Sequence, residues 1–454
     1  MHNSLLLGVS VGDSFAEFSL LSDSTSLAQK RVYLSRENLK TSLTQFVAPY
    51  KEQQIAKAFI SLRVPKKLLD HRLSGAVAHV STEGVEHWLN ICGSPEHTLT
   101  SKDLQFSVRE RILADGQVEL PLQVEEVEAI AAKVQLMDCK KVCLNFLHSA
   151  TNPVHLEQAK KIFQEKGLEV FVPEKSDNPH EVSRWTKNAL NATLSGVFAE
   201  IKSELYAGLE AAIDRKNIHF LDSAGDLFQE ESQREVGSLF ASLSALGLAD
   251  ASNTADILYL GLEQFALISP SQWESAWQSP WGPVEVRRLK THNLGIQPTL
   301  GIQLNSFGRF DFSNQQEAWE PGPMFLGRGQ KMSLLDVWSD NSKLAKIAGL
   351  EDRVSTQGIQ RFKNALLTLS KISSLRDTDL HHLTKELQSL SVQRLAMESR
   401  LRRQTKKLKV TGPLAPLFAN IFKKDPHTTI IEQEFCESES TALWGAQALK
   451  AALS

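Results

Sequence analysis

Histidine and cysteine are the side chains of this sequence best suited to hold a metal ion or to act as nucleophiles. The chain contains 13 histidines and four cysteines: Cys92, Cys139, Cys143 and Cys436. Zinc sites usually place such residues in close pairs or in an H-E-x-x-H helix. Cys139 and Cys143 have no second pair nearby, and the adjacent His381 and His382 point to different faces of a helix. We expect buried thiols and no metal site, although a site assembled from distant residues stays open.

Loops that bind phosphate are a second possible source of chemistry. The sequence has no Walker loop, no G-x-G-x-x-G and no G-x-S-x-G elbow. Glycine accounts for 24 of 454 residues, about 5%, where about 7% is usual. Because a backbone that approaches phosphate closely needs glycine, this composition disfavours a glycine-looped nucleotide binder.

Two further groups of side chains could bind a partner. Trp273, Trp277 and Trp281 would form one stripe on a helix, but the Pro and Gly residues at 280–283 would end that helix. We favour packing or a partner interface over a ligand platform. The second group is basic and lies on a predicted helix, where a solvated face is favoured over nucleic-acid binding. Its members are Arg394, Arg400, Arg402, Arg403, Lys406, Lys407 and Lys409.

Composition limits the class of protein. With 50 Lys+Arg against 53 Asp+Glu, the chain is neither a globally basic nucleic-acid binder nor a highly charged disordered chain. A length of 454 residues predicts two or three domains. No stretch reaches the 18 or so apolar residues of a membrane span, and the N-terminal apolar run lacks a basic leader. We therefore expect a cytoplasmic protein that does not enter a membrane.

The elements that would position these residues follow from apolar periodicity. Two strand-turn-strand units are predicted, one at 5–21 and one at 257–268. Segments 140–147, 155–166 and 168–172 predict a β-α-β unit. Helices are predicted at 193–212 and over most of 357–409, and a strand followed by a helix (441–453) at 430–453. Two α/β halves that each open with a hairpin are the plan of the actin-like ATPases, in which the two hairpin turns clamp the nucleotide phosphates.

Several motifs resemble the hydantoinase A/5-oxoprolinase family. Residues 106–122 (FSVRERILADGQVELPL) are similar to a strand and turn of that family, and 148–157 (HSATNPVHLE) to its "H-S-y-x-N-P-x-H-E". Weaker matches keep the family's order over about residues 5 to 345. They are Ser81–Val85 (STEGV), Asn191-Ala192, Ser223–Asp226 (SAGD), His292–Gly295 (HNLG) and 321–329 (PGPMFLGRG).

This resemblance implies a fold, an activity and cofactors. The fold would be a two-domain α/β structure of the actin-like (ASKHA-type) ATPase class with a central cleft. Its domains would cover 1–192 and 193–454, with a helical insertion at about 357–409. The ancestral activity would be the ATP- and Mg²⁺-dependent opening of cyclic amides such as 5-oxoproline or hydantoins. Family members usually continue into a further C-terminal region, which we expect this chain to lack.

The first phosphate loop departs from the family pattern "G-x-D-x-G-G-T". Here it reads GVSVGDS from Gly8 to Ser14. Ser10 removes the carboxylate that holds the metal ion in this fold, usually through water. Asp13 adds a side chain and a negative charge where a glycine amide should face phosphate. Transfer of metal binding to Asp13 is the less favoured alternative.

The other loops depart as well. The second phosphate loop, "D-x-G-G-T-S-T-D", reads YLGLEQFA at 259–266, and its Glu263 would repel a phosphate. Pro298 removes an amide donor from the loop that follows Gly295. The family's "H-G-T-T" has no counterpart between residues 58 and 75, and its "S-G-P-A" is replaced near 241–245. The residues left in the nucleotide loops are Gly8, Gly12, Asp13, Ser14, Gly261, Gly295 and Gly412.

Joint loss of these loops predicts a diverged hydantoinase/oxoprolinase-like protein that no longer uses ATP and serves as a non-catalytic or regulatory subunit. One alternative is an active hydrolase with relocated groups, for which His148, His155 and His292 are candidates. The other is an interaction or scaffold protein that uses the Trp273–Trp281 segment and the basic helix. The resemblance implies a hydantoinase B-like partner, and a homo-oligomer is also possible. No nucleic-acid partner and no catalytic residue are predicted.

Overall fold

The computed structural model describes most of the chain. The described residues are 5–22, 25–34, 37–53, 55–63, 76–91, 93, 98–175, 180–229, 234–249, 254–316, 324–326, 332–338, 356–372, 379–422 and 429–430. The predicted helix at 441–453, Cys92, Cys436 and most of the 321–329 motif lie outside them. Within these ranges, no helix combines the length and the apolar composition needed to cross a membrane.

The first sheet is built on the N-terminal hairpin, as predicted. The apolar runs form β1 (Leu5–Val11) and β2 (Phe15–Ser22), which pair antiparallel. β3 (Thr25–Tyr33) continues this meander, and β4 (Ile55–Leu62) pairs parallel with the other edge of β1. Two later strands complete the six-stranded order β12-β11-β4-β1-β2-β3, namely β11 (Ile218–Leu221) and β12 (Leu227–Phe228).

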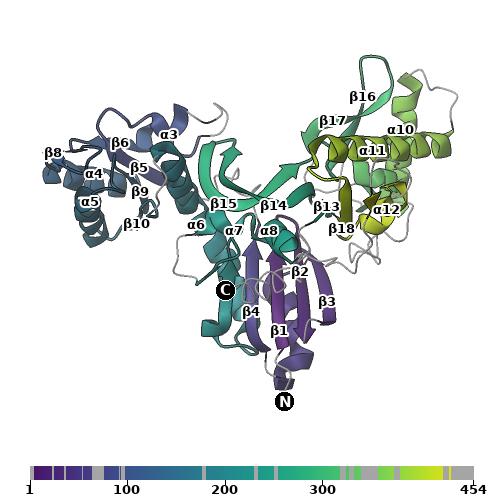
Figure 1. The fold of residues 1–454 in the computed structure, drawn as a ribbon, viewed down its shortest axis with the longest axis horizontal. Coiled ribbons are helices and arrows are strands. Elements are labelled where there is room, and N and C mark those ends of the chain that lie inside the picture. The colour runs from purple at the N-terminus through teal and green to yellow at the C-terminus, as the bar shows by residue number, and fades with distance from the viewer. Residues whose placement is uncertain are drawn as a thin grey trace.

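A second sheet repeats this plan. β13 (Asp256–Leu260) and β14 (Phe265–Ser279) form the second predicted hairpin, with β15 (Gly282–Asn293) as its third antiparallel strand. β18 (Lys407–Thr411) then pairs parallel with β13, so the order is β15-β14-β13-β18-β19. In each sheet the first strand of a hairpin lies between its antiparallel partner and a parallel strand. The two sheets meet near the centre of the molecule (Figure 1).

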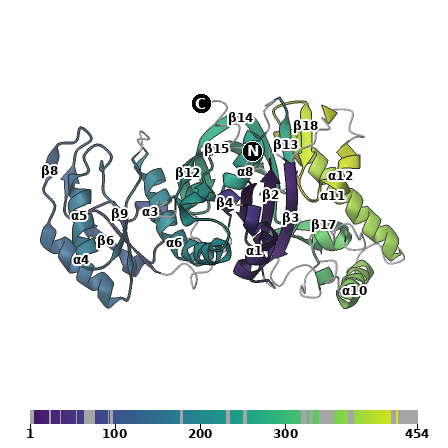
Figure 2. The same cartoon turned by 90° about the horizontal axis from the view of Figure 1, so that it is seen from below.

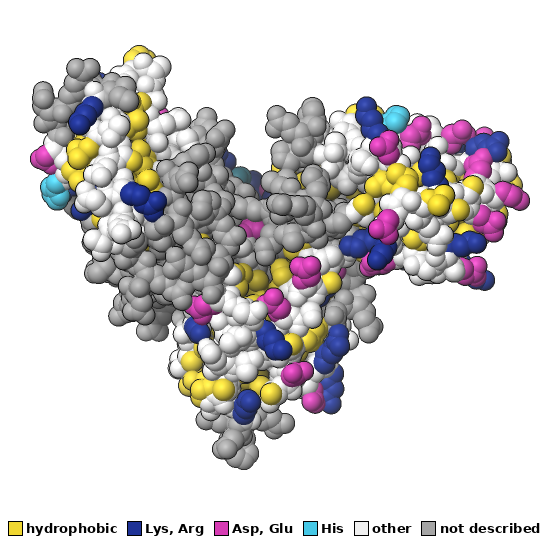
Figure 3. All heavy atoms as spheres, turned by 180° about the vertical axis from the view of Figure 1, so that it is seen from behind, with side chains coloured by type: hydrophobic (Ala, Val, Ile, Leu, Met, Phe, Trp, Pro, Cys, Tyr) yellow, Lys and Arg dark blue, Asp and Glu magenta, His cyan; other side chains and the backbone are white. Residues whose placement is uncertain are grey.

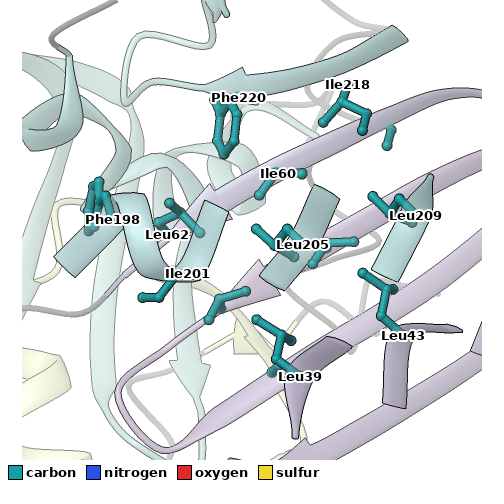
Figure 4. Packing of buried hydrophobic residues seen from close by; sticks show 14 of the residues in the cluster. Leu39, Leu43, Ile60, Leu62, Phe198, Ile201, Leu205, Leu209, Ile218 and Phe220 are labelled. Carbon is teal, nitrogen blue, oxygen red and sulfur yellow. The ribbon is translucent and has the colours of Figure 1, made fainter. Parts of the chain in front are cut away.

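A long helix covers the first sheet. α6 (Glu181–Leu209) begins at Glu181 rather than at the predicted residue 193. Its leucines and Phe198 pack against β4, β11 and α1 (Leu39–Val47), as Figure 4 shows. Helix α8 (Ala241–Leu248) lies between the two sheets, because its buried face packs against Phe59 of β4 and Ile268 of β14. This packing places the β1–β2 and β13–β14 turns side by side.

A third lobe carries an all-parallel sheet of order β10-β9-β5-β6. The predicted β-α-β unit is confirmed as β9 (Lys141–Asn145), α5 (Val154–Glu165) and β10 (Glu169–Phe171). β5 (Val77–Thr82) and β6 (Gln105–Val108) complete the sheet, and α4 (Val124–Leu136) packs beside α5. The lobe lies at the left of Figures 1 and 2, away from the two hairpin turns.

The predicted boundary at 192/193 lies inside α6, and β11 and β12, which follow it, join the first sheet. We propose instead that the boundary falls between β12 and β13, where the chain changes sheets. Helix is observed at α10 (Thr356–Ile372) and α11 (Leu380–Arg402), but the prediction for 357–409 is wrong at its end. There Lys407 and Lys409 belong to β18, since pairing with β13 overrides the local helical pattern.

The remaining elements are short or peripheral. They are 3-10 turns at Ala48–Gln53, Lys102–Leu104, Arg215–Asn217, Met324–Leu326 and Leu334–Trp338, helices α3 (Trp88–Ile91), α7 (Glu235–Ser238) and α12 (Ala415–Phe422), and strands β7 (Arg111–Ile112), β8 (Val118–Leu120), β16 (Leu300–Leu304), β17 (Phe310–Gln316) and β19 (Thr429–Ile430).

Candidate functional site

The turn between β1 and β2 presents its backbone N–H groups to a carboxylate from the other sheet. Ser14 N donates to Oε1 of Glu263 at 2.5 Å, and Phe15 N donates to the same oxygen at 3.3 Å. The second oxygen, Oε2, accepts from Nη2 of Arg63 at 2.9 Å. The Glu263 side chain is only 6% exposed and that of Arg63 11%. The carboxylate thus occupies a buried cradle of donors between the two hairpin turns.

The β1–β2 turn is shaped for this close approach. Gly12 N donates to Phe15 O at 2.7 Å, and Arg63 N donates to Val11 O at 2.6 Å, so the turn and the start of the next segment are held by backbone bonds. A Cβ atom on Gly12 would clash with the Glu263 carboxylate. Glycine is therefore needed at position 12 to admit a side chain of this protein.

Ser10, which replaces the metal-binding aspartate of the family pattern, belongs to a buried hydroxyl network. Its Oγ lies 3.0 Å from Oγ of Ser242, which lies 2.9 Å from Oγ of Ser61. Ser238 closes the group, because its carbonyl oxygen accepts from Ser61 Oγ at 3.3 Å and its Oγ accepts from Leu62 N at 3.0 Å. All four serines are buried. The network joins the carboxyl ends of β1 and β4 to α7 and α8, and it offers uncharged oxygens where Mg²⁺ would favour carboxylates.

The second hairpin turn is closed by its own chain. Gly261 N donates to Gln264 O at 2.9 Å. The side chain of Gln297 then bridges this hairpin to the following loop: its Oε1 accepts from Phe265 N at 2.8 Å, and its Nε2 donates to Phe265 O and to Leu294 O. Gln297, which interrupts the glycine run of the family pattern, thereby satisfies backbone groups of the loop.

The two later glycines also serve internal contacts. Gly295 N donates to the carboxylate of Glu398 from α11, a second case of a glutamate at a loop amide. Gly412 has φ +101°, and a Cβ there would meet the backbone of Leu260 within 3 Å. Leu414 N donates to Leu260 O at 3.0 Å, so this turn packs directly on β13. The structure places Gly8 inside β1, opposite Ser19 and Phe59, and Asp13 half-buried in the first turn.

Three of the motifs that carried the family resemblance, at 81–85, 106–122 and 148–157, converge in the third lobe. Glu110 is buried at 1% exposure and receives hydrogen bonds on both oxygens. Thr82 Oγ1 donates to Oε1, and Nδ1 of His155 lies 2.7 Å from Oε2. Thr82 Oγ1 in turn accepts from Leu147 N at 2.9 Å. The network ties the loops after β5, β6 and β9 together, which is a scaffold role for these residues.

The histidines of the hydrolase alternative are not brought together. His148 adopts φ +56° and donates its N–H to Oε1 of Glu181, while His155 is bound to Glu110 in the same lobe. His292 lies on β15 in another sheet, opposite Leu267, and burial lowers its pKa. Among the described residues, no group of three His, Cys, Asp or Glu side chains is placed to hold a metal ion. Cys139 and Cys143 are buried free thiols, and burial raises the pKa of Cys143.

Sequence reasoning missed His79, which lies on the face of β5 that packs against α6. Its ring is fully buried, and neither ring nitrogen has a hydrogen-bond partner within the described part of the chain. The ring centroid lies 6.4 Å from that of Trp185. Burial lowers the pKa of His79 to about 4, so the ring is neutral at pH 7. Alternation of Val77, His79 and Ser81 with apolar neighbours was the available signal.

Replacing His79 with Leu is expected to raise the free energy of unfolding at pH 7 by about 1–2 kcal/mol, because two unpaired polar nitrogens leave the core. The pKa lies below its unfolded value of 6.5, so protonation of the unfolded chain lowers the free energy of unfolding as the pH falls from about 6.5 toward 4. The loss amounts to about 3 kcal/mol. Urea unfolding at pH 7.5 and pH 5 measures both effects. His381→Leu on the exposed face of α11 is the control, and an unchanged pH slope in His79→Leu would contradict the assignment.

The tryptophan segment is a strand pair. Trp273 and Trp277 lie on β14, and Trp281 lies in the turn before β15. The ring of Trp277 packs edge-on against two other rings, with centroid distances of 4.9 Å to Phe240 and 6.3 Å to Trp281. The guanidinium of Arg287 lies over the ring of Trp273. The helical stripe is therefore absent here, and the packing interpretation holds for Trp277 and Trp281. Trp273 is half-exposed.

The basic run is divided between elements. α11 ends at Arg402, and Lys409 is buried on β18. Arg394 pairs with Asp311 at 3.1 Å. Figure 3 shows the face opposite to that of Figure 1, where basic and acidic side chains are interspersed over the third lobe at the right.

Three comparisons with known proteins bear on this geometry. Residues 35–167 match the family model described as "Hydantoinase/oxoprolinase N-terminal region". An uncharacterized protein of Methanocaldococcus jannaschii is 27% identical over 136 residues, which cover 29% of this chain and 20% of that protein. The chain thus spans about a fifth of this relative's length.

Two solved structures share the fold. The nucleotide-free structure of acetone carboxylase superposes with a TM-score of 0.74 at 12% identity, over 99% of this chain and 70% of the other. The ATP-dependent caprolactamase of Pseudomonas jessenii superposes with a TM-score of 0.72 at 18% identity, over 97% and 70%. With the two repeated sheets, these likenesses confirm the predicted α/β fold of the actin-like ATPase class.

Proposed function

We propose that this chain is a diverged member of the hydantoinase/oxoprolinase family, whose N-terminal region it matches at residues 35–167, and that it neither binds ATP tightly nor hydrolyses it. The observation that carries the proposal is the Glu263 carboxylate in the donor cradle of the first phosphate loop. In the fold that this chain resembles, that cradle faces the nucleotide phosphates.

Electrostatics support this proposal. A phosphate oxygen about 4 Å from the Glu263 carboxylate would be repelled by about 4 kcal/mol at an effective dielectric constant of 20. Moving Glu263 away would break its buried ion pair with Arg63. Ser10 supplies no charge for Mg²⁺, because its hydroxyl is neutral, and that hydroxyl is already bonded to Ser242. Phosphoryl transfer depends on such metal and donor contacts, so their loss removes its main stabilisation.

The wild-type chain is expected to show no binding of Mg-ATP or Mg-ADP tighter than about 10 μM, which corresponds to about −7 kcal/mol. Isothermal titration calorimetry measures this directly. The parallel assay is ATP-dependent hydrolysis of 5-oxoproline, where no turnover is expected. Tighter binding, or a turnover that Asp13→Ala abolishes, would return the chain to the active-hydrolase alternative.

A non-catalytic member acts through a partner, and we propose a hydantoinase B-like subunit as that partner, with a second copy of this chain as the other possibility. The proposal rests on the family resemblance. Mass measurement by light scattering, on the chain alone and after coexpression with such a subunit, distinguishes a monomer, a homo-oligomer and a mixed complex. A chain that stays monomeric in both samples would oppose both partners.

A further inference from the structure

Three donors that hold Glu263 come from the first sheet and from the residue that follows β4. Ser14 N and Phe15 N belong to the β1–β2 turn, and Arg63 follows β4 directly. Glu263 itself comes from the β13–β14 turn of the second sheet, about 250 residues away in sequence. The donor set and its acceptor are therefore separate parts of the fold.

The backbone of this cradle is held by hydrogen bonds that do not involve the glutamate. Gly12 N to Phe15 O closes the turn, and Arg63 N to Val11 O fixes the start of the segment after β4. Both bonds remain when the Glu263 side chain is shortened. Two backbone N–H groups and one guanidinium, largely shielded from water, form a ready site for a planar or tetrahedral oxyanion.

We infer that this cradle is an anion-binding site which Glu263 fills, and that it takes a small oxyanion, a carboxylate or inorganic phosphate, once that side chain is shortened. In the wild-type protein the tethered carboxylate excludes the external anion, because tethering gives it an effective concentration of at least millimolar order. The inference rests on the proposed function only for the identity of the loop.

The first test compares the full-length wild-type chain with Glu263→Ala by thermal melting in sodium chloride, formate, acetate and phosphate at matched ionic strength. Glu263→Ala is expected to melt lower than the wild type in chloride. Acetate and phosphate should each raise its Tm by about 2–4 °C, with half-saturation on the order of 1–10 mM, as suits ligands of four or five heavy atoms. The wild type should not respond beyond the effect of chloride.

Two further variants isolate the cradle. Glu263→Gln keeps the side-chain volume, so its Tm should not respond to either anion. The double variant Arg63→Ala with Glu263→Ala removes the guanidinium and should lose at least tenfold in anion sensitivity relative to Glu263→Ala. The inference is overturned if acetate and phosphate raise the Tm of Glu263→Ala no more than chloride does. It is also overturned if the Tm of the double variant rises with these anions as much as that of Glu263→Ala.

Failure of folding is also informative. If Glu263→Ala does not fold in chloride, its refolding yield with and without 50 mM acetate becomes the readout, and equal yields overturn the inference. A carboxylate-only response identifies a planar site, and a response to phosphate shows that the tetrahedral anion also fits. Either supports the inference. These results are independent of the proposed function, which the wild-type titration with Mg-ATP decides.

Discussion

Arg63→Ala is expected to lower the free energy of unfolding by about 3–5 kcal/mol, because it leaves the buried Glu263 carboxylate without its cationic partner. Ser14 N and Phe15 N still bind the other oxygen, which places the expected value toward the lower end. Urea unfolding followed by circular dichroism measures the effect at pH 7.

A double-mutant cycle gives the sharper form of this result. Arg63→Ala combined with Glu263→Ala should cost less than the sum of the two single changes, with an interaction energy of about 1–3 kcal/mol. Lys161→Ala is the control, because its pair with Glu165 is exposed on α5 and such pairs contribute at most about 0.5 kcal/mol. An additive cycle would mean that the Arg63–Glu263 contact does not hold the two sheets together.

Glu110→Ala is expected to destabilise the protein by about 3–5 kcal/mol. The substitution removes the acceptor shared by Thr82 and His155, both of which are buried, and it leaves a cavity between the loops after β5 and β6. The measurement is again urea unfolding at pH 7. Protection from hydrogen exchange should also fall in β5 and β9, whose loops this network joins.

Glu110→Gln separates the hydrogen bonds from the cavity. The amide keeps the volume and one acceptor oxygen, so its cost should be about half that of Glu110→Ala. Glu128→Gln on α4 is the control, because that side chain is exposed. A loss below about 1 kcal/mol in Glu110→Ala would contradict the scaffold role of the network.

The sequence predicted the local elements well where apolar periodicity was strong. Both hairpins and the β-α-β unit could be found because their alternation is contained in short segments. The end of the helical region at 407–411 and the tryptophan strand could not, since sheet pairing with distant strands decides those conformations. The predicted division at 192/193 falls within α6, before β11, and β11 pairs with β4 across 160 residues of chain.

For the candidate site, sequence by itself determined which loops had lost their glycines and aspartates, and that Glu263 is unfavourable to phosphate. Only the tertiary structure decided that this carboxylate is the occupant of the cradle, since its donors, Ser14 and Arg63, lie about 250 and 200 residues away. Charge and residue type are properties of the chain at one position. A buried pair between two turns exists only after the sheets have packed on α8, which brings the two hairpins together.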